Sequence, residues 1–263
     1  MHDFLKKIIA ARRRDIAEAE KQIPLAVLRK AAKAKQPPRS LMARLQTAPQ
    51  GRPANIIAEM KRASPSEGEI ATNLNPAALA REYEAAGAAA ISVLTEPHYF
   101  RGKDSDLREA RRAVKIPVLR KDFTVAPWQV YQSAVLGADV ILLIAAALPP
   151  ASLKELYRAS EEAGLEAIIE VHSLPELETA LRFPRAIIGV NNRNLATLKT
   201  DIAAAVKLAD SIPESRVAIA ESGIRSRREI TLLAELDYRG FLVGTSLLKS
   251  KSPGAAVKKL AGI

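Results

Sequence analysis

The sequence contains no cysteine, which excludes disulfide bonds, thiolate nucleophiles and cysteine-ligated metals. Histidine occurs only as His2, His98 and His172, and these positions are too scattered along the chain to predict a histidine metal cluster. Aromatic residues make up only 4% of the 263 residues, and no stretch interleaves them with basic residues as a base-stacking surface would require. These absences argue against a metal site and against a nucleic-acid stacking platform.

Long apolar runs are also missing. The longest is "VILLIAAAL", Val140 to Leu148, well short of the roughly 20 apolar residues that a membrane span needs. The first 20 residues intersperse acids with bases and lack a small-residue cleavage site after an apolar core, so they do not form a signal peptide. We therefore expect a cytoplasmic protein with no membrane partner.

Positive charge is in excess, with 40 Lys and Arg against 29 Asp and Glu and a net charge of +11. Such a balance suggests nucleic-acid binding. However, the densest basic clusters, Ala11–Asp15 and Arg225–Glu229, lie in helical stretches with acids nearby. We expect no nucleic-acid partner, and interpret the charge as a basic surface scattered around an anion-binding enzyme.

Short β-rich runs alternate with helical stretches, such as residues 76–87 and 151–164, that end in Gly. The β-rich runs are Asn55–Lys61, Ala89–Glu96, Ile116–Phe123, Ala138–Ala146, Glu166–Val171, Ala186–Arg193, Arg216–Ser222 and Arg239–Ser246. Such alternation predicts repeated βα units, and eight of them favour a single (β/α)8 TIM barrel in the α/β class. An open doubly wound sheet is the alternative, but no G-x-G-x-x-G follows the first strand.

Residues 1–50 precede the barrel and are predicted to form an N-terminal helical extension, with residues 51–263 as the catalytic barrel domain. Phe4, Leu5, Ile8 and Ile9 recur at helical spacing, so the first helix should pack one face against the barrel. A second helix is predicted over 24–34. The sequence is compatible with a helix that plugs the bottom of the barrel and with one that covers its top.

The stretch "NIIAEMKR" places two charges at the end of the first predicted strand. Because strand side chains alternate faces, Glu59 and Lys61 share a face with Ile57 and would be costly to bury. A lone buried charge most often forms a structural ion pair. Here further polar residues end the later strands, namely Lys121, Glu170, Asn191, Arg193 and Glu221. Because the carboxyl ends of barrel strands form active sites, this convergence predicts a site with perturbed pKa values.

The last two strands are followed by small residues. "AESGI" and "LVGTSL" place Gly223 and Gly244 just past the strand ends, beside the hydroxyls of Ser222 and Thr245. Glycine lets backbone N–H groups approach an anion closely, and the loops after the seventh and eighth strands are the usual phosphate site of such barrels. Each glycine alone could simply close a tight turn, but the pair in register predicts a phosphate site.

Taken in order from Ile56 to Leu248, the motifs "IIAEMKRASPS", "SVLTEPHYFRG", "VLRKDF", "IIEV", "GVNNRNL", "AESGI" and "FLVGTSLL" resemble the indole-3-glycerol phosphate synthase family of tryptophan biosynthesis. The resemblance implies a carboxy-lyase, a carbon–carbon lyase. It would close the ring of 1-(2-carboxyphenylamino)-1-deoxyribulose 5-phosphate with loss of carbon dioxide and water. It also implies a small phosphorylated substrate as partner and no metal or organic cofactor. We expect a monomer or weak homo-oligomer.

The resemblance implies catalytic roles for four residues. Lys121 looks like the general acid at the ketone oxygen, and Glu170 like the residue for proton transfer in the dehydration. Glu59 is placed to assist Glu170, and which carboxylate acts as acid or base is left open. Asn191 resembles a group that positions the substrate hydroxyls.

The resemblance also implies the substrate-binding residues. Lys61 resembles a substrate-anion ligand with Ser64 near the carboxylate, and Arg193 and Glu221 resemble a binding and orienting pair. The expected apolar slot for the anthranilate ring is Phe100, Phe123, Leu142 and Leu198, and the expected phosphate ligands are Gly223, Gly244, Thr245 and Ser222. Two positions depart from the commonest pattern, with Glu67 where a Lys is frequent and Thr245 where a Ser is common.

Other functions compete with this interpretation. Another sugar-phosphate barrel enzyme, such as phosphoribosylanthranilate isomerase, would share the phosphate loops, but its acid and base are typically a Cys and an Asp. The lack of cysteine argues against it. A non-catalytic anion-binding barrel and a structural barrel with interior ion pairs are the remaining alternatives.

Overall fold

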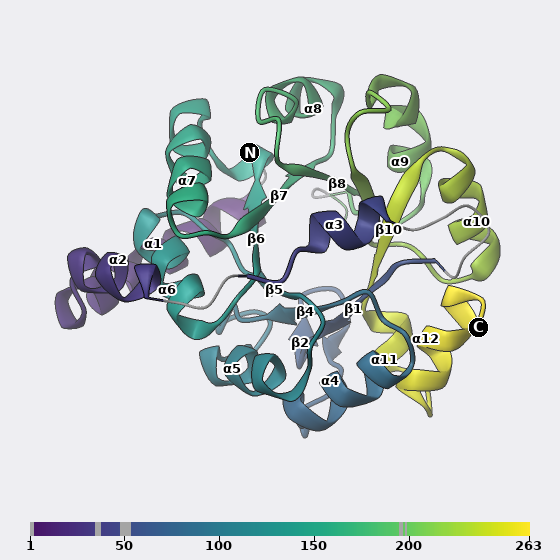
Figure 1. Cartoon of the computed structure of the whole chain (residues 1–263), viewed down its shortest axis with the longest axis horizontal. Coiled ribbons are helices and arrows are strands. Elements are labelled where there is room, and N and C mark those ends of the chain that lie inside the picture. Colours follow the sequence, from purple (N-terminus) through teal and green to yellow (C-terminus); the bar gives the residue numbers. More distant parts are fainter. Residues whose placement is uncertain (1–2, 35–37, 48–53, 195–196, 198) are drawn as a thin grey trace.

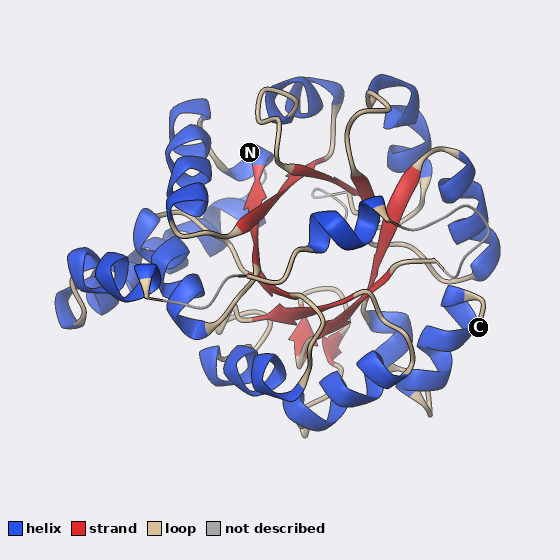
Figure 2. Ribbon diagram, viewed as in Figure 1, coloured by secondary structure: helices blue, strands red, loops and turns tan. Residues whose placement is uncertain are grey.

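The computed structural model describes residues 3–34, 38–47, 54–194, 197 and 199–263. Its parallel strands close into a barrel in the order β1-β10-β9-β8-β7-β6-β5-β4 (Figures 1 and 2). The barrel strands are β1 (Ile56–Met60), β4 (Ala90–Leu94), β5 (Val118–Lys121), β6 (Val140–Ile144), β7 (Glu166–Val171), β8 (Ile187–Asn191), β9 (Ala218–Glu221) and β10 (Tyr238–Val243). Each lies within a predicted run or differs from it by one residue at its start, so the predicted (β/α)8 barrel is confirmed.

Helices surround the barrel on the outside (Figure 2). They are α4 (Pro76–Ala85), α5 (Asp104–Ala113), α6 (Pro127–Leu136), α7 (Pro150–Glu162), α8 (Leu174–Ala180), α9 (Ala203–Leu208), α10 (Arg227–Glu235), α11 (Thr245–Leu248) and α12 (Pro253–Ala261), with short 3-10 turns η1 (Ala145–Ala147) and η2 (Ala209–Ser211). Proline near the start of α4, α6, α7, α8 and α12 fixes the first turn where an N–H would have no helical partner. No helix in these described ranges is long and apolar enough to cross a membrane.

The strands are apolar along their length because both of their faces are covered. Ile56 and Ile57 are adjacent on β1 and point to opposite faces, yet both are fully buried. One face fills the barrel interior and the other packs under the helices. A charged group in the interior of this barrel is therefore largely removed from water.

The N-terminal helices close both ends of the barrel. α1 (Asp3–Gln22) brings Phe4 and Leu5 to the carboxyl ends of the strands, where they line a pocket together with Lys121. α3 (Leu41–Gln46) lies across the opposite opening, in the centre of Figure 1. There Leu45 packs so closely on Gly240 that a Cβ at position 240 would lie 2.7 Å from its Cδ2. The cover and the plug are thus both present, in different helices.

Two contacts fix the first helices to the barrel. Arg12 on α1 donates hydrogen bonds of 3.0 and 2.9 Å from Nε and Nη2 to the buried carboxylate of Asp122, next to β5. Trp128 on α6 donates a 2.7 Å bond to the carbonyl of Ile23, between α1 and α2 (Leu25–Lys33). Asp122 is therefore a structural partner for α1, and Trp128 has a packing role, as its position after a proline at the start of a helix predicts.

Candidate active site

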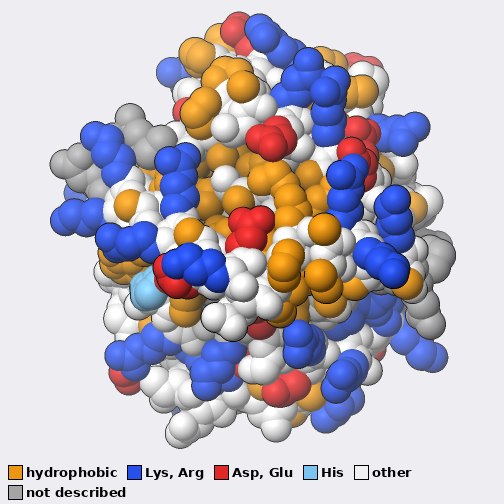
Figure 3. Space-filling model, turned by 90° about the vertical axis from the view of Figure 1, so that its left-hand side faces the viewer, with side chains coloured by type: hydrophobic (Ala, Val, Ile, Leu, Met, Phe, Trp, Pro, Cys, Tyr) orange, Lys and Arg blue, Asp and Glu red, His pale blue; other side chains and the backbone are white. Residues whose placement is uncertain are grey.

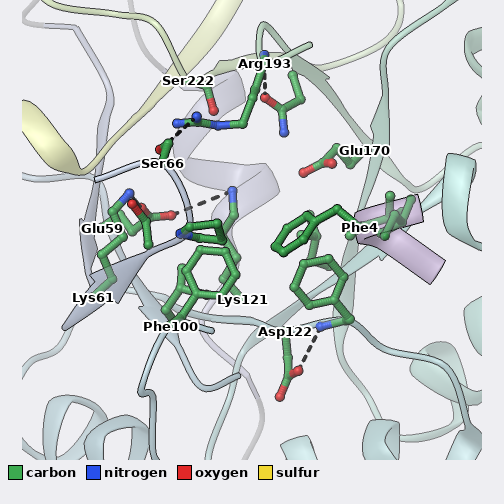
Figure 4. Close-up of a pocket in the computed structure, with 18 residues that line it drawn as sticks. Phe4, Glu59, Lys61, Ser66, Phe100, Lys121, Asp122, Glu170, Arg193 and Ser222 are labelled. Atoms are coloured by element: carbon green, nitrogen blue, oxygen red, sulfur yellow. Dashed lines mark hydrogen bonds and ion pairs between the residues drawn. The ribbon is translucent and has the colours of Figure 1, made fainter. Parts of the chain in front are cut away.

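A pocket opens at the carboxyl ends of the barrel strands, under α1 (Figure 4). It brings together residues from most of the strand ends that the sequence singled out. Its lining includes Glu59, Lys61, Ser64, Phe100, Lys121, Phe123, Leu142, Glu170, Asn191, Arg193 and Ser222. Leu198 lies outside the described residues. The pocket is polar on one side and apolar on the other, as binding an aromatic ring attached to a sugar phosphate requires.

Lys121, the last residue of β5, occupies the polar floor of the pocket. Its Nζ lies 2.6 Å from Oε2 of Glu221 and 3.7 Å from Oε2 of Glu59. Burial alone would lower the pKa of Lys121, but the carboxylates of Glu221, Glu59 and Glu170 raise it above the ordinary lysine value. Lys121 is therefore a protonated donor aimed into the pocket.

Glu59 and Lys61 explain why β1 ends in two charges. Lys61 donates a 2.6 Å hydrogen bond from Nζ to Oε1 of Glu59, and both side chains are largely buried. Burial favours the neutral form of Glu59, but Lys61 and Lys121 outweigh it and lower the pKa of this carboxyl. The ionised carboxylate thus lies between two ammonium groups, and one of its oxygens faces each.

Glu221 lies beneath the pocket floor and is fully buried. Its Oε2 accepts the hydrogen bond from Lys121, while Oε1 is buried with no hydrogen-bond partner among the described residues. The expected role of Glu221 and Arg193 as a binding and orienting pair for the substrate stays a prediction. Arg193 donates a 3.2 Å bond from Nη1 to the hydroxyl of Ser66, in the loop after β1. Arg193 ties the pocket rim together, and Glu221 orients Lys121 from below.

The space for Glu221 depends on a glycine in the neighbouring strand. A Cβ at Gly189 on β8 would lie 2.3 Å from Oε1 of Glu221 and 2.8 Å from Cγ2 of Ile168. Neither contact is possible without a shift of the neighbouring side chain. Gly189 thus has a role in the site that the sequence analysis missed, because a glycine inside a strand does not itself indicate which side chain it accommodates.

Glu170 and Asn191 end β7 and β8 on the far side of the pocket. Both side chains are largely buried, yet both contribute to the pocket lining. Nε2 of the His172 ring lies 3.5 Å from Oε1 of the Glu170 carboxylate. The side chain of Asn191 accepts a 3.0 Å hydrogen bond from the backbone N–H of Arg193 and so bends the chain at the strand end.

The apolar side of the pocket is built on two phenylalanines. The rings of Phe100 and Phe123 lie 6.2 Å apart with 36° between their planes, and Leu142 adds an aliphatic wall. Phe4 and Leu5 form further walls of the pocket that the sequence did not predict. Their helical spacing predicts a buried face of α1, but not which end of the barrel that face covers.

The loop that carries Phe100 is held by one buried carboxylate. Glu96 accepts hydrogen bonds of 3.0, 2.7 and 3.0 Å from the N–H groups of His98, Tyr99 and Phe100. Tyr99 in turn packs edge-on against Phe4 with ring centroids 5.1 Å apart. The same turn therefore sets both the wall of the slot and the contact with α1.

A second pocket adjoins the first and contains the predicted phosphate residues. Ser222, Gly223, Gly244 and Thr245 all line it. Ser222 and Gly223 have φ values of 65° and 76°. This left-handed backbone conformation is readily adopted by glycine but is unfavourable for serine. Successive N–H groups in such a turn form a concave anion site.

Gly244 meets a second constraint, since a Cβ there would lie 2.4 Å from Oε1 of Glu59. The glycine expected to serve the phosphate therefore also makes room for a carboxylate of the active site. The sequence analysis missed this link between the two pockets, because it joins residues at opposite ends of the chain.

Basic residues that the sequence analysis did not select also line the phosphate pocket. Lys249, just after α11, and Arg225, just before α10, are both part of its lining. Lys249 forms an ion pair with Glu67 from the loop after β1. In the sequence these basic residues could not be told from the many other exposed Lys and Arg residues of this chain.

Across the described ranges, no group of three or more His, Asp or Glu side chains is arranged to hold a metal ion. The groups gathered in the pockets are ammonium, guanidinium, carboxylate and amide groups together with backbone N–H groups. Such a set can bind a doubly charged phosphate, hold a carboxylate, and give and take protons.

Comparisons with known proteins show which family this chain resembles. A sequence model described as "Indole-3-glycerol phosphate synthase" matches residues 5–260. The chain is similar to the indole-3-glycerol phosphate synthase of Acidithiobacillus ferrooxidans, with 42% identity over 261 residues and 99% of each chain covered. It is also similar to that of Syntrophobacter fumaroxidans, with 44% identity over 262 residues, covering 100% of this chain and 98% of the relative.

Solved structures resemble the fold at low sequence identity. Tryptophan synthase subunit alpha from Legionella pneumophila has a TM-score of 0.62 and 13% identity, with 84% of this chain and 97% of that chain covered. KGPDC from Streptococcus mutans has a TM-score of 0.61 and 13% identity, with 80% and 96% covered. At this identity the likeness concerns the barrel fold alone.

Proposed function

The chain belongs to the indole-3-glycerol phosphate synthase family, and from that premise we propose which of its residues carry each step of the reaction. It is a carbon–carbon lyase of tryptophan biosynthesis. It closes the ring of 1-(2-carboxyphenylamino)-1-deoxyribulose 5-phosphate and releases carbon dioxide and water. The observation that supports the residue roles best is Lys121, a buried ammonium group between two carboxylates that faces an apolar slot.

Lys121 is the acid of the ring closure in this proposal. As the aromatic carbon attacks the ketone, the ketone oxygen becomes an alkoxide and takes up a proton. A ketone is a poor base and an alkoxide a strong one, so an ammonium group with a raised pKa can still donate as the new bond forms. Glu59 and Glu221 hold Nζ in place and keep it protonated before the substrate binds.

The decarboxylation follows from the product of ring closure. The attacking aromatic ring becomes a cation, and this cation accepts the electron pair of the breaking carbon–carbon bond as carbon dioxide leaves. The protein's task is to hold the carboxylate until that point. Lys61 and Ser64 line the pocket where that group would lie, and Lys61 supplies the positive charge. The apolar walls Phe100 and Phe123 keep the ring in one plane.

The dehydration needs one proton delivered to the hydroxyl group and one removed from the ring. Glu170 and Glu59 are the carboxylates that reach the pocket from β7 and β1, and we assign the two proton transfers to them. Asn191 and Arg193 orient the hydroxyl chain of the substrate. Arg193 is already fixed by its bond to Ser66.

The phosphate is assigned to the second pocket. Gly223, Gly244 and Thr245 offer backbone N–H groups and a hydroxyl there, and Ser222 lines both pockets. The distance between the pockets is bridged by the sugar chain in this assignment. Phosphate binding thus fixes one end of the substrate while the aromatic slot fixes the other, which orients the reacting carbons between them.

Location, partners and domain organisation are also proposals. We propose a cytoplasmic enzyme, a monomer or weak homo-oligomer without a nucleic-acid partner, with residues 1–50 as a helical extension of the barrel domain 51–263. In support, Lys and Arg side chains are spread over the face at the left of Figure 1 rather than gathered in one stripe (Figure 3). Light scattering and a salt-dependent nucleic-acid binding assay test these points.

The assignment of steps is tested by following two products separately. In a single turnover, Glu170→Gln should release carbon dioxide and form little indole, because ring closure precedes the dehydration that needs Glu170. Lys121→Met should release neither product. If Glu170→Gln forms indole at the parental rate, the assignment of Glu170 is wrong.

A further inference from the structure

His172 lies between two carboxylates beside the active site. It comes directly after β7, two residues beyond Glu170, and its side chain is only 13% exposed. Its Nε2 is 3.5 Å from Oε1 of Glu170, and its Nδ1 is 3.4 Å from Oε2 of Glu176 on α8. The ring therefore bridges a pocket residue and a residue of the outer helix layer.

Glu176 is itself held in place. Its Oε2 accepts a 2.8 Å hydrogen bond from the backbone N–H of His172, and its Oε1 accepts a 2.9 Å bond from the hydroxyl of Ser173. The carboxylate thus caps the first turn of α8, where the helix favours negative charge. Because Glu176 is fixed, it fixes one side of the His172 ring.

The backbone cap does not explain the position of the ring. Any residue except proline at position 172 could supply the N–H that bonds Glu176. The two ring nitrogens are buried and have no hydrogen-bond partner of good geometry among the described residues, yet each points to a carboxylate. An imidazole buried in this way interacts with its neighbours mainly through charge.

The charged groups around His172 come from four elements. Glu170 on β7, Glu176 on α8 and Glu221 on β9 are negative, and Lys121 on β5 is a cation that interacts with Glu170 and Glu221. Burial lowers the pKa of His172, but its interaction with Glu176 and the charges of Glu170 and Glu221 raise it above the ordinary histidine value. The surrounding carboxylates therefore favour the cationic form of the ring over the neutral form.

We propose that His172 is a positioning residue which, held by Glu176, orients the Glu170 carboxylate and places the ring beside it, so that Glu170 acts as the proton acceptor of the dehydration. This inference rests on the proposed role of Glu170 and narrows it to that of the base. Glu170 accepts one proton and becomes a neutral carboxyl group, and the departing hydroxyl group takes up a proton that the Lys61 ammonium supplies through its hydrogen bond to Glu59. His172 touches neither substrate nor product and acts only through Glu170.

The test is the pH profile of kcat for His172→Gln, with thermal unfolding as a check on the fold. Removing a positive charge beside a carboxylate favours its protonated form, so the acid limb should move to higher pH by about one unit. Indole formation should fall by up to about tenfold at pH values below the parental acid limb and match the parental rate at pH values well above the limb of the variant. Glu176→Gln should move the limb in the same direction by less, because His172 loses a charge that favours its cation.

His98→Gln is the matched control. The ring of His98 also faces a carboxylate, that of Asp15 at 2.9 Å, but it is 46% exposed and lies outside the catalytic groups. The acid limb of the His98→Gln pH profile should coincide with that of the parent. A profile for His172→Gln with the parental acid limb overturns the inference, and so does a loss of activity of equal size at every pH.

A parallel measurement on Glu170→Gln distinguishes a failure of the role proposed for Glu170 from a failure of the inference about His172. If Glu170→Gln keeps full indole formation, the proposed function of Glu170 fails, and the inference about His172 fails with it. If Glu170→Gln is inactive while His172→Gln has the parental profile, Glu170 keeps its role and only the inference about His172 is overturned.

Discussion

Lys121 and Glu221 form a 2.6 Å ion pair across the barrel. They lie 100 residues apart in the sequence, on β5 and β9, which are diametrically opposite in the strand order. Glu221 is fully buried, so the pair carries the desolvation cost of two charges in an apolar barrel. A barrel built only for stability gains little from such a pair, and an enzyme that needs a fixed proton donor gains much.

The first prediction separates stability from activity at this pair. Lys121→Met alone leaves the buried Glu221 carboxylate with an unsatisfied charge, so we expect it to lower the free energy of unfolding by about 3 kcal/mol. Lys121→Met combined with Glu221→Leu removes both charges, and we expect this double variant to be at least as stable as the parent and inactive. Chemical denaturation and an indole assay measure the two properties. A double variant less stable than Lys121→Met would indicate a structural role for the pair.

The second prediction concerns the space beside Glu221. Gly189→Ala places a methyl group against Oε1 of Glu221, so the carboxylate has to move and carry Lys121 with it. We expect kcat to fall by about 100-fold, since a displacement of about 1 Å can cost that much.

The control for this prediction is a double-mutant cycle. Glu221→Ala removes the clashing carboxylate, so adding Gly189→Ala to it should cost less unfolding free energy than Gly189→Ala costs in the parent. Strictly additive free energies would mean that Gly189 acts through Ile168 instead.

Much of this architecture could be predicted from the sequence. The strands are near-continuous apolar runs, so their number and approximate bounds follow from the pattern. The polar residues at the strand ends predict one common site at the carboxyl end of the barrel. Pairings across the barrel could not be predicted, because nothing local links Lys121 to Glu221 or Gly244 to Glu59. The amphipathic pattern of α1 shows that one face is buried, but an end of the barrel is chosen by tertiary contacts such as that of Arg12 with Asp122.

The third prediction tests how α1 is attached. Arg12→Met removes a two-bond contact with the buried Asp122, and we expect a loss of about 3 kcal/mol of stability at pH 7. We also expect a higher KM, because α1 carries the pocket residues Phe4 and Leu5. Arg13→Met, which changes an exposed residue of the same helix, should leave both properties unchanged.

The loss of stability expected for Arg12→Met should depend on pH with a defined sign. Burial opposes ionisation of Asp122, but Arg120 and Arg12 outweigh it and lower its pKa. A carboxyl group whose pKa is lowered by folding stabilises the fold at pH values above its pKa in the unfolded chain, which is near 3.9. This stabilisation is lost as the pH falls through the lowered pKa of the folded state. The stability difference between parent and Arg12→Met should therefore shrink on going from pH 7 to pH 3. A difference that grows in acid would contradict the role of this ion pair.

The fourth prediction concerns Glu67, an acidic residue that lines the phosphate pocket. Glu67 brings a negative charge to the lining and pairs with Lys249. Glu67→Lys should free Lys249 for the phosphate and lower KM about threefold with little change in kcat, the size expected for an exposed ion pair. Glu69→Lys alters the same loop outside the pocket lining and serves as the control. A raised KM in Glu67→Lys alone would show that the ion pair instead holds the loop in its binding position.

The central claim is that Lys121 supplies the proton for ring closure. Its most direct test is a single-turnover indole fluorescence assay of the parent and Lys121→Met, each shown to be folded by circular dichroism, with a chelator present. The account predicts turnover by the parent and a rate lower by about 10³-fold or more in the variant, the size of effect expected for loss of a positioned general acid. A folded Lys121→Met variant that forms indole within tenfold of the parental rate would contradict it.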